Sequence, residues 1–401
     1  MSNKLYWVWV QNALGISASV KSDEIVSYFG NAEKLYFAGA YEWKISGIFT
    51  NGQINKLKST SLDGAKRIVA ECEKYKIKIV TPDDENYPSM LFKLPNLPLV
   101  LYVRGDLDCL KNKITVAMVG AREASDIGVR IARSLSASLS RSGAVVVSGA
   151  AKGIDSAAHT GALNVGAKTV AVLGCGFGTD YLPENEPLRR EIAHHGALVT
   201  EYPPRTPAFG HNFPFRNRII SGLSYGTIVI EANERSGSLR TVNHAMEQGR
   251  DIFAVPGDIT SSMNMGTNKL LRDGAKPVFN AMDVLEEYAE RYPDMLDIDK
   301  IEAVLTTEPE RVKTVTAKKE KVKKKEDTET EETKPFVKSA APNNISEKAR
   351  LIFNAFSEET MQAEELILRT KLSTVDFLSA MTELEILGYI EPLAGKNYKL
   401  K

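Results

Sequence analysis

The sequence lacks the cysteine patterns of disulfide-rich and zinc-binding proteins. Its three cysteines, Cys72, Cys109 and Cys175, lie more than thirty residues apart and form no Cys-x-x-Cys pair. We therefore expect free thiols in a reducing compartment. No apolar stretch approaches the length of about eighteen residues that a membrane-spanning helix needs, and the apolar run Leu5–Val10 is too short for a secretory signal. These absences predict a cytoplasmic protein without a membrane span.

The sequence also has no excess of charge of either sign. Fifty-one Lys and Arg residues balance 51 Asp and Glu, which excludes an acidic tail protein and a uniformly basic nucleic-acid coat. Arginine, however, is unevenly distributed: 13 of the 19 basic residues between 111 and 290 are Arg, against 6 of 32 elsewhere. Because the guanidinium binds phosphate through two donors, an anion site is expected in this middle segment. Surface ion pairs are the alternative.

The length of 401 residues predicts more than one domain. The expected divisions are a helical domain at 1–80, an extended proline-rich connector at 81–110, a core at 111–290, a charged flexible linker at 291–342 and a small C-terminal domain at 343–401. Within the linker, Arg311–Lys325 is basic and Glu326–Glu332 is acidic. Almost nothing there is apolar, so no core can offset the entropy of ordering it.

Short apolar runs rich in β-branched residues alternate with helical stretches between residues 111 and 290. Such runs are typical of parallel strands that are covered on both faces, and right-handed crossovers then produce an α/β, doubly wound, Rossmann-like sheet. The expected strands are Ile114–Val119, Ala144–Val147, Thr169–Leu173, Ala197–Thr200, Thr227–Ile230, Ile252–Val255 and Pro277–Phe279. Ligands bind beyond the carboxyl ends of such strands, so function is expected in the loops there.

Four glycine-bearing turns follow these strands at one edge of the predicted sheet. They are Gly120–Arg122, Ser148–Asp155, Gly174–Gly178 and Glu231–Leu239. Glycine lets a backbone approach an anion, and the helix that follows adds unpaired N–H groups, so together the turns indicate a phosphate site. Tight turns without a ligand are the alternative. The dinucleotide and P-loop motifs are both absent, which disfavours NAD and nucleoside triphosphates, and no cofactor is expected.

The segment Phe-Pro-Phe-Arg-Asn-Arg lies at the predicted start of a helix. Its arginines, Arg216 and Arg218, flank Asn217 and diverge on a helix, so both can serve one ligand only if that ligand is extended or if the turn is irregular. An unpaired polynucleotide is such a ligand. Three aromatic residues could stack on its bases, although core packing is the alternative role: Phe209, Phe213 and Phe215.

Conventional catalytic sets are missing from the sequence. The five histidines have no spacing that predicts a metal site, and no nucleophile lies beside a base. Asp155 and His159 are four residues apart, which is more typical of a hydrogen bond at a helix start than of acid–base catalysis. We therefore expect a binding protein with no metal and no chemical turnover.

The C-terminal segment has the order of a winged helix, with three predicted helices followed by two strands. In the third helix, Ser373–Leu387, no Arg or Lys is available to read a DNA duplex, so protein contact or a structural role is expected instead. An apolar stripe on this helix is expected to form the core: Leu372, Val375, Leu378, Met381, Leu384 and Leu387.

Seven ordered motifs between about Ile114 and Leu285 resemble the DprA/Smf family of DNA-processing proteins. These motifs are Val119–Arg122, Ser148–His159, Tyr181–Asn185, Glu201–Tyr202, Phe213–Ile219, Glu231–Ala232 with Ser236–Leu239, and Gly249–Arg250 with Val255–Gly257. The resemblance implies a protein that binds single-stranded DNA without sequence preference, protects incoming DNA, forms a homodimer and loads the RecA recombinase in natural transformation. It also implies an N-terminal domain similar to a sterile alpha motif or a helix-hairpin-helix, and a C-terminal winged helix.

The same resemblance assigns DNA-binding residues by motif. They would be Gly120, Arg122, Ser148, Gly149, Lys152, Gly153, Phe213, Arg216, Asn217, Arg218, Ser236, Gly237 and Ser238. Some members have a lysine where this chain has Gly210, and Arg205 or His211 are the candidates to replace it.

Two alternatives remain at the level of the sequence. One is an enzyme similar to the nucleoside-monophosphate phosphoribohydrolases of a related fold, with Glu231 as a base, although their Pro-Gly-Gly run is absent here. The other is a protein adaptor that acts through its terminal domains, which leaves the arginine-rich turns without a purpose.

Overall fold

The computed structural model describes residues 3–296 and, in the C-terminal part, 342, 345–357, 360–370, 372, 374–393 and 397–400. The chain divides into two compact units, Met1–Val315 and Thr316–Lys401, and each is described by itself. Most of the predicted linker at 291–342 lies outside the described residues.

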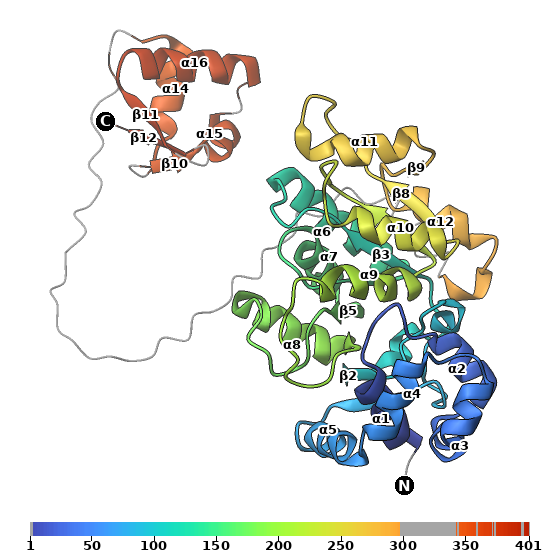
Figure 1. Ribbon diagram of the computed structural model, residues 1–401. Helices are drawn as coiled ribbons and strands as arrows, with labels where there is room; N and C mark the ends of the chain where they lie inside the picture. The colour runs from blue at the N-terminus through green and yellow to red at the C-terminus, as the bar shows by residue number, and fades with distance from the viewer. Residues whose placement is uncertain are drawn as a thin grey trace, which may run out of the picture. The chain divides into compact units, whose positions relative to one another are not determined.

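Five helices begin the first unit and gather at one end of it (Figure 1). They are α1 (Asn3–Leu14), α2 (Ser22–Phe29), α3 (Ala32–Ile45), α4 (Asn51–Ser59) and α5 (Leu62–Lys74). Side-chain caps explain several of their starts: Asn31 precedes α3, Ser61 precedes α5, and Thr50 with Gln53 makes a capping box at α4. Gly39 has a φ of 75° and kinks α3.

One sheet of nine strands runs through the described part of this unit. The strands are β1 (Lys78–Val80), β2 (Leu101–Gly105), β3 (Thr115–Val119), β4 (Val145–Ser148), β5 (Thr169–Leu173), β6 (Ala197–Thr200), β7 (Gly226–Val229), β8 (Asp251–Ala254) and β9 (Lys276–Pro277). Their order is β1-β2-β6-β5-β4-β3-β7-β8-β9, and every pair from β6 to β9 is parallel. The doubly wound α/β fold is thus confirmed, and the strand order reverses between β3 and β7.

Helices follow most strands of the parallel part and cover the sheet. They are α6 (Asp126–Arg141), α7 (Ile154–Asn164), α8 (Glu186–His195), α9 (Asn212–Gly222), α10 (Leu239–Glu247), α11 (Met265–Arg272) and α12 (Met282–Ala289). Alternate residues of β3 enter different cores, because successive strand side chains point to opposite faces. Ala117 belongs to the core that contains residues of α9 and the N-terminal helices, whereas Val116 belongs to the core that contains residues of α6 and α12. Both faces are therefore buried, as the continuous apolar runs predict.

The segment predicted as an extended connector adds β2 to the sheet, antiparallel to β6, and β1 pairs with β2. The N-terminal helices pack on the same core as these strands. In that core the Gln11 amide donates to the backbone oxygen of Glu201 at 3.0 Å, and the Tyr102 hydroxyl donates to Gln11 at 2.9 Å. The helical segment is thus joined to the sheet by one continuous core, and the domain limits at residues 80 and 110 stay a prediction.

The end of the described core lies beyond α12. Pro293–Met295 form a short 3-10 helix, and Leu296 is buried against the core that contains α6 and α12. Residues 291–296 of the predicted linker therefore pack on the sheet unit. The predicted boundary at residue 290, between the core and the linker, stays a prediction.

The second unit has the element order of a winged helix. Its elements are α14 (Glu347–Ala355), β10 (Thr360–Gln362), α15 (Ala363–Thr370), α16 (Thr374–Ile386), β11 (Ile390–Leu393) and β12 (Asn397–Leu400), with the strand order β10-β12-β11. The predicted winged-helix fold is confirmed.

The predicted apolar stripe on α16 is wrong in part. Met381 and Leu384 are buried as predicted, and Leu372 packs against the same core. Leu378 and Leu387 are exposed by 57% and 42%, and Phe377 and Ala380, which the stripe omits, are buried. The stripe was drawn in steps of three residues, and each such step falls about 60° short of a full helical turn. Five consecutive steps therefore pass around the helix, whereas mixed steps of three and four residues stay on one face.

All three cysteines are free and buried. Burial raises the pKa of the Cys72 and Cys109 thiols to about 12, and it also raises that of Cys175. Within the described residues, no helix is long and apolar enough to cross a membrane.

Candidate functional site

A cleft of about 560 Å³ opens where the strand order reverses. It is lined by the turn after β3, the first half of α9 and the turn that joins β7 to α10. The crevice at such a reversal, beyond the carboxyl ends of the strands, is where doubly wound sheets bind their ligands. The cleft contains eight of the thirteen predicted DNA-binding residues: Gly120, Arg122, Phe213, Arg216, Asn217, Ser236, Gly237 and Ser238.

Two glycines are required by the close approach of other groups rather than by a ligand. A Cβ on Gly120 would lie 2.5 Å from a side-chain carbon of Ile154 and 2.9 Å from the backbone oxygen of Glu231. A Cβ on Gly149 would lie 2.6 Å from both the Arg216 guanidinium and the Asp155 carboxylate. These glycines therefore allow the turns to pack together at the base of the cleft.

Arg122 is exposed at the rim of the cleft. Its guanidinium lies 5.5 Å from the centre of the Phe213 ring, and it has no ion-pair partner in the part of the chain that the structure describes. An exposed guanidinium that is held by an aromatic face but not neutralised by a carboxylate keeps its donors available. Arg122 can thus contact an anion that enters the cleft.

Arg216 lies on the floor of the cleft and is 4% exposed. Its Nη1 donates to the backbone oxygen of Gly149 at 3.0 Å and also to that of Val172. Burial lowers the pKa of Arg216, while the charge of nearby Asp155 acts in the opposite direction. Arg216 therefore has part of its hydrogen-bonding capacity already used and contributes a buried positive charge beneath the cleft.

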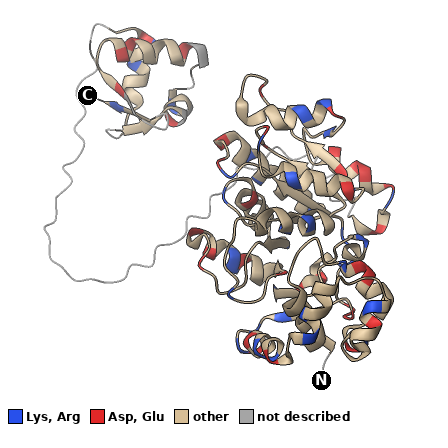
Figure 2. Ribbon diagram, viewed as in Figure 1, with Lys and Arg blue, Asp and Glu red and all other residues tan. Residues whose placement is uncertain are grey.

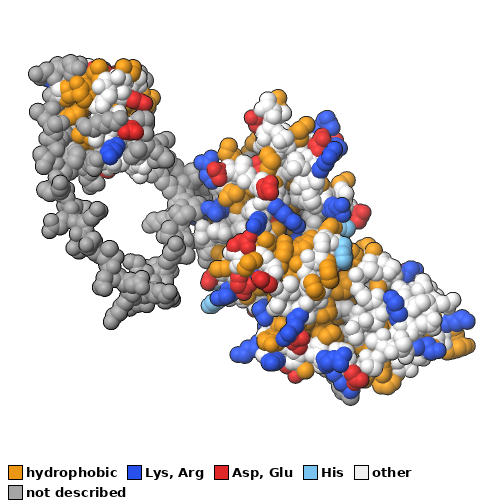
Figure 3. All heavy atoms as spheres, turned by 60° about the vertical axis from the view of Figure 1, so that its left-hand side comes forward, with side chains coloured by type: hydrophobic (Ala, Val, Ile, Leu, Met, Phe, Trp, Pro, Cys, Tyr) orange, Lys and Arg blue, Asp and Glu red, His pale blue; other side chains and the backbone are white. Residues whose placement is uncertain are grey.

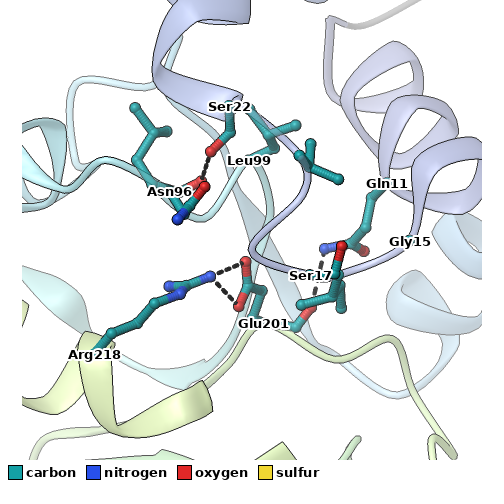
Figure 4. Close-up of a pocket in the computed structure, with 11 residues that line it drawn as sticks. Gln11, Gly15, Ser17, Ser22, Asn96, Leu99, Glu201 and Arg218 are labelled. Carbon is teal, nitrogen blue, oxygen red and sulfur yellow. Dashed lines mark hydrogen bonds and ion pairs between the residues drawn. The ribbon is translucent and has the colours of Figure 1, made fainter. Parts of the chain in front are cut away.

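Arg218 lies outside the cleft, contrary to the sequence-based expectation. It is buried, and its Nη2 donates to both carboxylate oxygens of Glu201 at 2.7 Å (Figure 4). Because residues two apart on a helix differ in direction by about 200°, Arg218 faces the N-terminal helices when Arg216 faces the cleft. The cavity beside this pair has a volume of only about 20 Å³, so no nucleotide fits there.

The turn after β4 also contributes less than expected. Ser148 is buried, and its hydroxyl donates to the backbone oxygen of Met118 at 2.7 Å. Lys152 is exposed and pairs with Glu184 at 2.5 Å, and the hydrogen bond to that carboxylate raises the pKa of Lys152. Neither these residues nor Gly149 and Gly153 line the cleft, whereas Ala151 and Asp155 of the same segment do.

Two arginines in the cleft were missed by the sequence analysis. Arg235, in the turn after β7, and Arg240, in the first turn of α10, line the cleft and are exposed without an ion-pair partner among the described residues. The signal for Arg235 was its position in a glycine-bearing turn at the same sheet edge as Arg122. Four arginines therefore line the cleft against two acids, Glu123 and Asp155.

Charges of both signs are mixed outside the cleft. Elsewhere on the first unit, basic and acidic residues are interspersed along the chain, and the face in Figure 3 shows no broad basic surface (Figures 2 and 3). Because the formal net charge of the chain is zero, the cleft arginines rather than the net charge would attract an anion.

Glu231, the base in the enzymatic alternative, is engaged in helix capping. Its carboxylate accepts hydrogen bonds from the backbone N–H and the hydroxyl of Ser125, both at 2.8 Å. Ser125 is the N-cap of α6, so this arrangement satisfies donors at the helix start. Glu231 is 4% exposed and does not line the cleft. It is therefore poorly placed to take a proton from a ligand there.

His159 is another buried group without an evident chemical role. Burial, followed by the charge of Arg216, lowers the pKa of His159 to about 3, so the ring is neutral at ordinary pH. Its Nδ1 lies 2.8 Å from the Thr169 hydroxyl. Among the described residues, no group of His, Cys, Asp and Glu could hold a metal ion.

The three candidate stacking residues differ in their surroundings. Phe213 is 9% exposed and packs against Tyr181 at 4.9 Å between ring centres, with the Arg122 and Arg216 guanidiniums over it. Phe215 lies under the guanidinium of Arg218 at 4.2 Å. Phe209 is 50% exposed and lies in the loop that precedes α9.

Comparison with known proteins gives the family. The family described as DNA recombination-mediator protein A matches residues 78–289, and the DprA winged helix domain matches residues 337–396. The chain belongs to the DprA/Smf family. The DprA/Smf assignment that the seven motifs indicated is thus confirmed.

Individual DprA proteins are similar over much of their length. DNA processing protein DprA of Bacillus subtilis (strain 168) is 38% identical over 225 residues, which cover 56% of this chain and 76% of that protein. The DprA of Streptococcus pneumoniae is 43% identical over 205 residues, 51% of this chain and 72% of that protein. The X-ray structure of DprA from S. pneumoniae matches with a TM-score of 0.63 at 34% identity and covers 72% of this chain and 98% of that one.

Proposed function

We propose that this member of the DprA/Smf family binds single-stranded DNA, without sequence preference, in the cleft between β3 and β7. The observation that carries the proposal is the set of three exposed arginines, Arg122, Arg235 and Arg240, around one open cleft at the reversal of strand order. Guanidiniums bind phosphate groups strongly but do not by themselves distinguish sequences.

The size of the cleft favours an unpaired strand over a duplex. About 560 Å³ is within the range of clefts that hold small ligands, and it suits a few nucleotides of a flexible strand. The buried guanidinium of Arg216 and the Ser236–Ser238 turn also line this cleft. In this proposal Arg122, Arg235 and Arg240 contact successive phosphates, Asn217 supplies a polar contact, and Arg218 supports α9 from behind.

An electrophoretic shift assay over a salt series tests the proposal. A single-stranded oligonucleotide should bind more tightly than its duplex, and log Kd should rise with log salt concentration with a slope of about 2, or about 0.7 for each of three neutralised phosphates. Different base sequences of equal length should bind alike. A complex that is insensitive to salt, or that forms equally with duplex, would contradict the proposal.

The broader role that we propose follows from the family. We propose that the protein acts in the cytoplasm, protects incoming single-stranded DNA and loads RecA recombinase onto it as a homodimer in natural transformation. Names of similar proteins from B. subtilis and S. pneumoniae, which are DNA processing proteins, support this proposal. RecA filament formation on coated oligonucleotides, with and without this protein, measures the loading step.

We also propose that the protein performs no chemical reaction. Glu231, the base of the phosphoribohydrolase alternative, uses both carboxylate oxygens to accept hydrogen bonds from Ser125. Incubation with adenosine monophosphate should therefore release no free adenine. Release that disappears in a Glu231→Gln variant would support the enzyme instead.

For the winged helix we propose contact with protein rather than with duplex DNA. Helix α16 contains no Lys or Arg, and Leu378 and Ile386 on it are exposed by 57% and 79%. Apolar side chains on a surface are typical of protein contacts, whereas DNA contacts need donors and positive charge. Deletion of residues 343–401 should therefore leave oligonucleotide affinity nearly unchanged.

A further inference from the structure

The loop before α9, which lines the cleft through Gly210, presents two aromatic rings to solvent. Phe209 and His211 are both exposed, and their rings stack with 5.6 Å between centres and 7° between planes. We call them the Phe209–His211 pair. An aromatic ring that is half exposed retains apolar surface that has not been removed from water, so a flat partner that covers it is favoured.

The loop that carries the pair is held by several hydrogen bonds. The N–H of Phe209 donates to the backbone oxygen of Pro207 at 2.9 Å, and the N–H of Asn212 donates to that of Phe209 at 3.0 Å. Asn212 is buried, and its backbone oxygen accepts a bond from the Tyr202 hydroxyl at 3.2 Å. The rings therefore lie on an ordered turn, so a ligand that stacks on them causes little further loss of backbone conformational entropy.

The loop that carries the pair reaches the cleft. Gly210, which lies between the two rings in sequence, is one of the residues that line the cleft. A Cβ at Gly210 would meet nothing within 4 Å, and its backbone φ is not in the left-handed region, so neither packing nor conformation requires glycine there. The loop therefore lines the cleft at Gly210 with backbone alone, and no side chain there obstructs a ligand.

The other two aromatic candidates are less available to a base. Phe213 has its ring covered by Tyr181 and by the guanidiniums of Arg122 and Arg216, and it is 9% exposed. Phe215 lies beneath Arg218, away from the cleft. Among the three phenylalanines, Phe209 has the largest exposed fraction, and its neighbour Gly210 lines the cleft.

We propose that the Phe209–His211 pair stacks an unpaired base of the strand whose phosphates lie in the cleft. This inference rests on the proposed function and adds the base contact to it. Stacking depends on the π-face that every base has, so the pair would strengthen binding without selecting a sequence. His211 supports the Phe209 ring and extends the stack.

Two oligonucleotides separate the base contact from the phosphate contacts. One is oligo(dT), and the other has the same length and phosphates but abasic sugars. Phe209→Ala should weaken oligo(dT) binding about 5- to 150-fold, the range for one stacked base, and leave the abasic strand almost unchanged. Arg122→Ala should weaken both strands. The matched control is Phe37→Ala, which removes a ring that is 68% exposed on α3 and should change neither.

Fluorescence gives a second measurement at the same position. Trp7, Trp9 and Trp43 are buried, with exposures of 0%, 1% and 5%, so a Phe209→Trp variant adds one exposed reporter to a nearly constant background. Its emission should be quenched by oligo(dT) and not by the abasic strand. His211→Phe should preserve oligo(dT) affinity, and His211→Ala should weaken it by less than Phe209→Ala does.

The outcomes are distinguishable. Two results would overturn the base contact and leave the proposed function standing. In the first, Phe209→Ala weakens the binding of both strands equally. In the second, oligo(dT) binds to Phe209→Trp without quenching its fluorescence, while Arg122→Ala still weakens oligo(dT) binding. If the unmodified protein binds neither strand, the proposed function fails, and the base contact fails with it.

Discussion

Arg122 and Arg218 show two different environments for arginine in the same small region. Arg122 is exposed at the rim of the cleft and lies over an aromatic ring, and it forms no salt bridge with a carboxylate of the described residues. Arg218 is buried and bonded to both oxygens of Glu201. The comparison teaches that two arginines to which sequence motifs assign the same role can have different roles in the structure. The first arginine can serve a ligand, and the second holds α9 against the core that contains the N-terminal helices.

The largest expected effect tests the structural role of Arg218. Arg218→Ala leaves the Glu201 carboxylate buried without its partner and should lower the free energy of unfolding by about 3–5 kcal/mol. Denaturant unfolding, followed by the fluorescence of the buried tryptophans, measures it. Replacing both partners with apolar residues, Glu201→Leu with Arg218→Met, should recover much of the loss. If Arg218→Ala alone left the free energy of unfolding unchanged, the Arg218–Glu201 pair would not stabilise the fold.

The next effect tests the ligand role of Arg122. Arg122→Ala removes a charge-assisted contact of about 1.5–3 kcal/mol and should weaken single-stranded DNA binding roughly ten- to a hundredfold, equally for all sequences. The salt slope should fall by about 0.7. The unfolding midpoint should not change. Arg67→Ala, which removes an exposed arginine on α5, is the matched control, and an equal loss there would remove the distinction between cleft and surface.

A third prediction concerns the stability of the protein at low pH and the buried residue His159. Because the pKa of His159 is about 3 in the folded protein and about 6.5 when unfolded, the unfolded chain binds one more proton between these values. Stability should therefore fall as pH decreases below 6.5, by about 2 kcal/mol at pH 5 from this residue. His159→Gln should remove that part of the pH dependence. If stability fell equally with decreasing pH in the His159→Gln variant, the pH dependence would come from other groups.

The smallest expected effect concerns Lys152. This exposed residue was assigned to DNA contact by its motif, but it pairs with Glu184 and does not line the cleft. Lys152→Ala should change oligonucleotide affinity by less than about threefold at physiological salt, since exposed pairs and distant charges are screened. A loss as large as that of Arg122→Ala would extend the binding surface to the turn after β4.

Sequence patterns predicted the sheet closely and the site only in part. All seven expected core strands are present, and β5 and β6 have the predicted limits, because continuous apolar runs are a local property. The position of Arg122 followed from the same reasoning, since parallel strands bring their carboxyl ends to one edge. Arg235 is not included in the motif of its turn, Ser236–Leu239, and only the folded turn places that residue in the cleft.

The amino-acid sequence by itself determined the alternation of strands and helices, the glycines at the sheet edge and the motifs of the DprA/Smf family. Only the tertiary structure decided which arginines are available to a ligand. That choice depends on whether folding brings a carboxylate to each one, and Glu201 lies seventeen residues before Arg218 in the chain and meets it only when β6 and α9 have packed. Electrostatic pairing of this kind is a property of three-dimensional distance, which local sequence patterns do not contain.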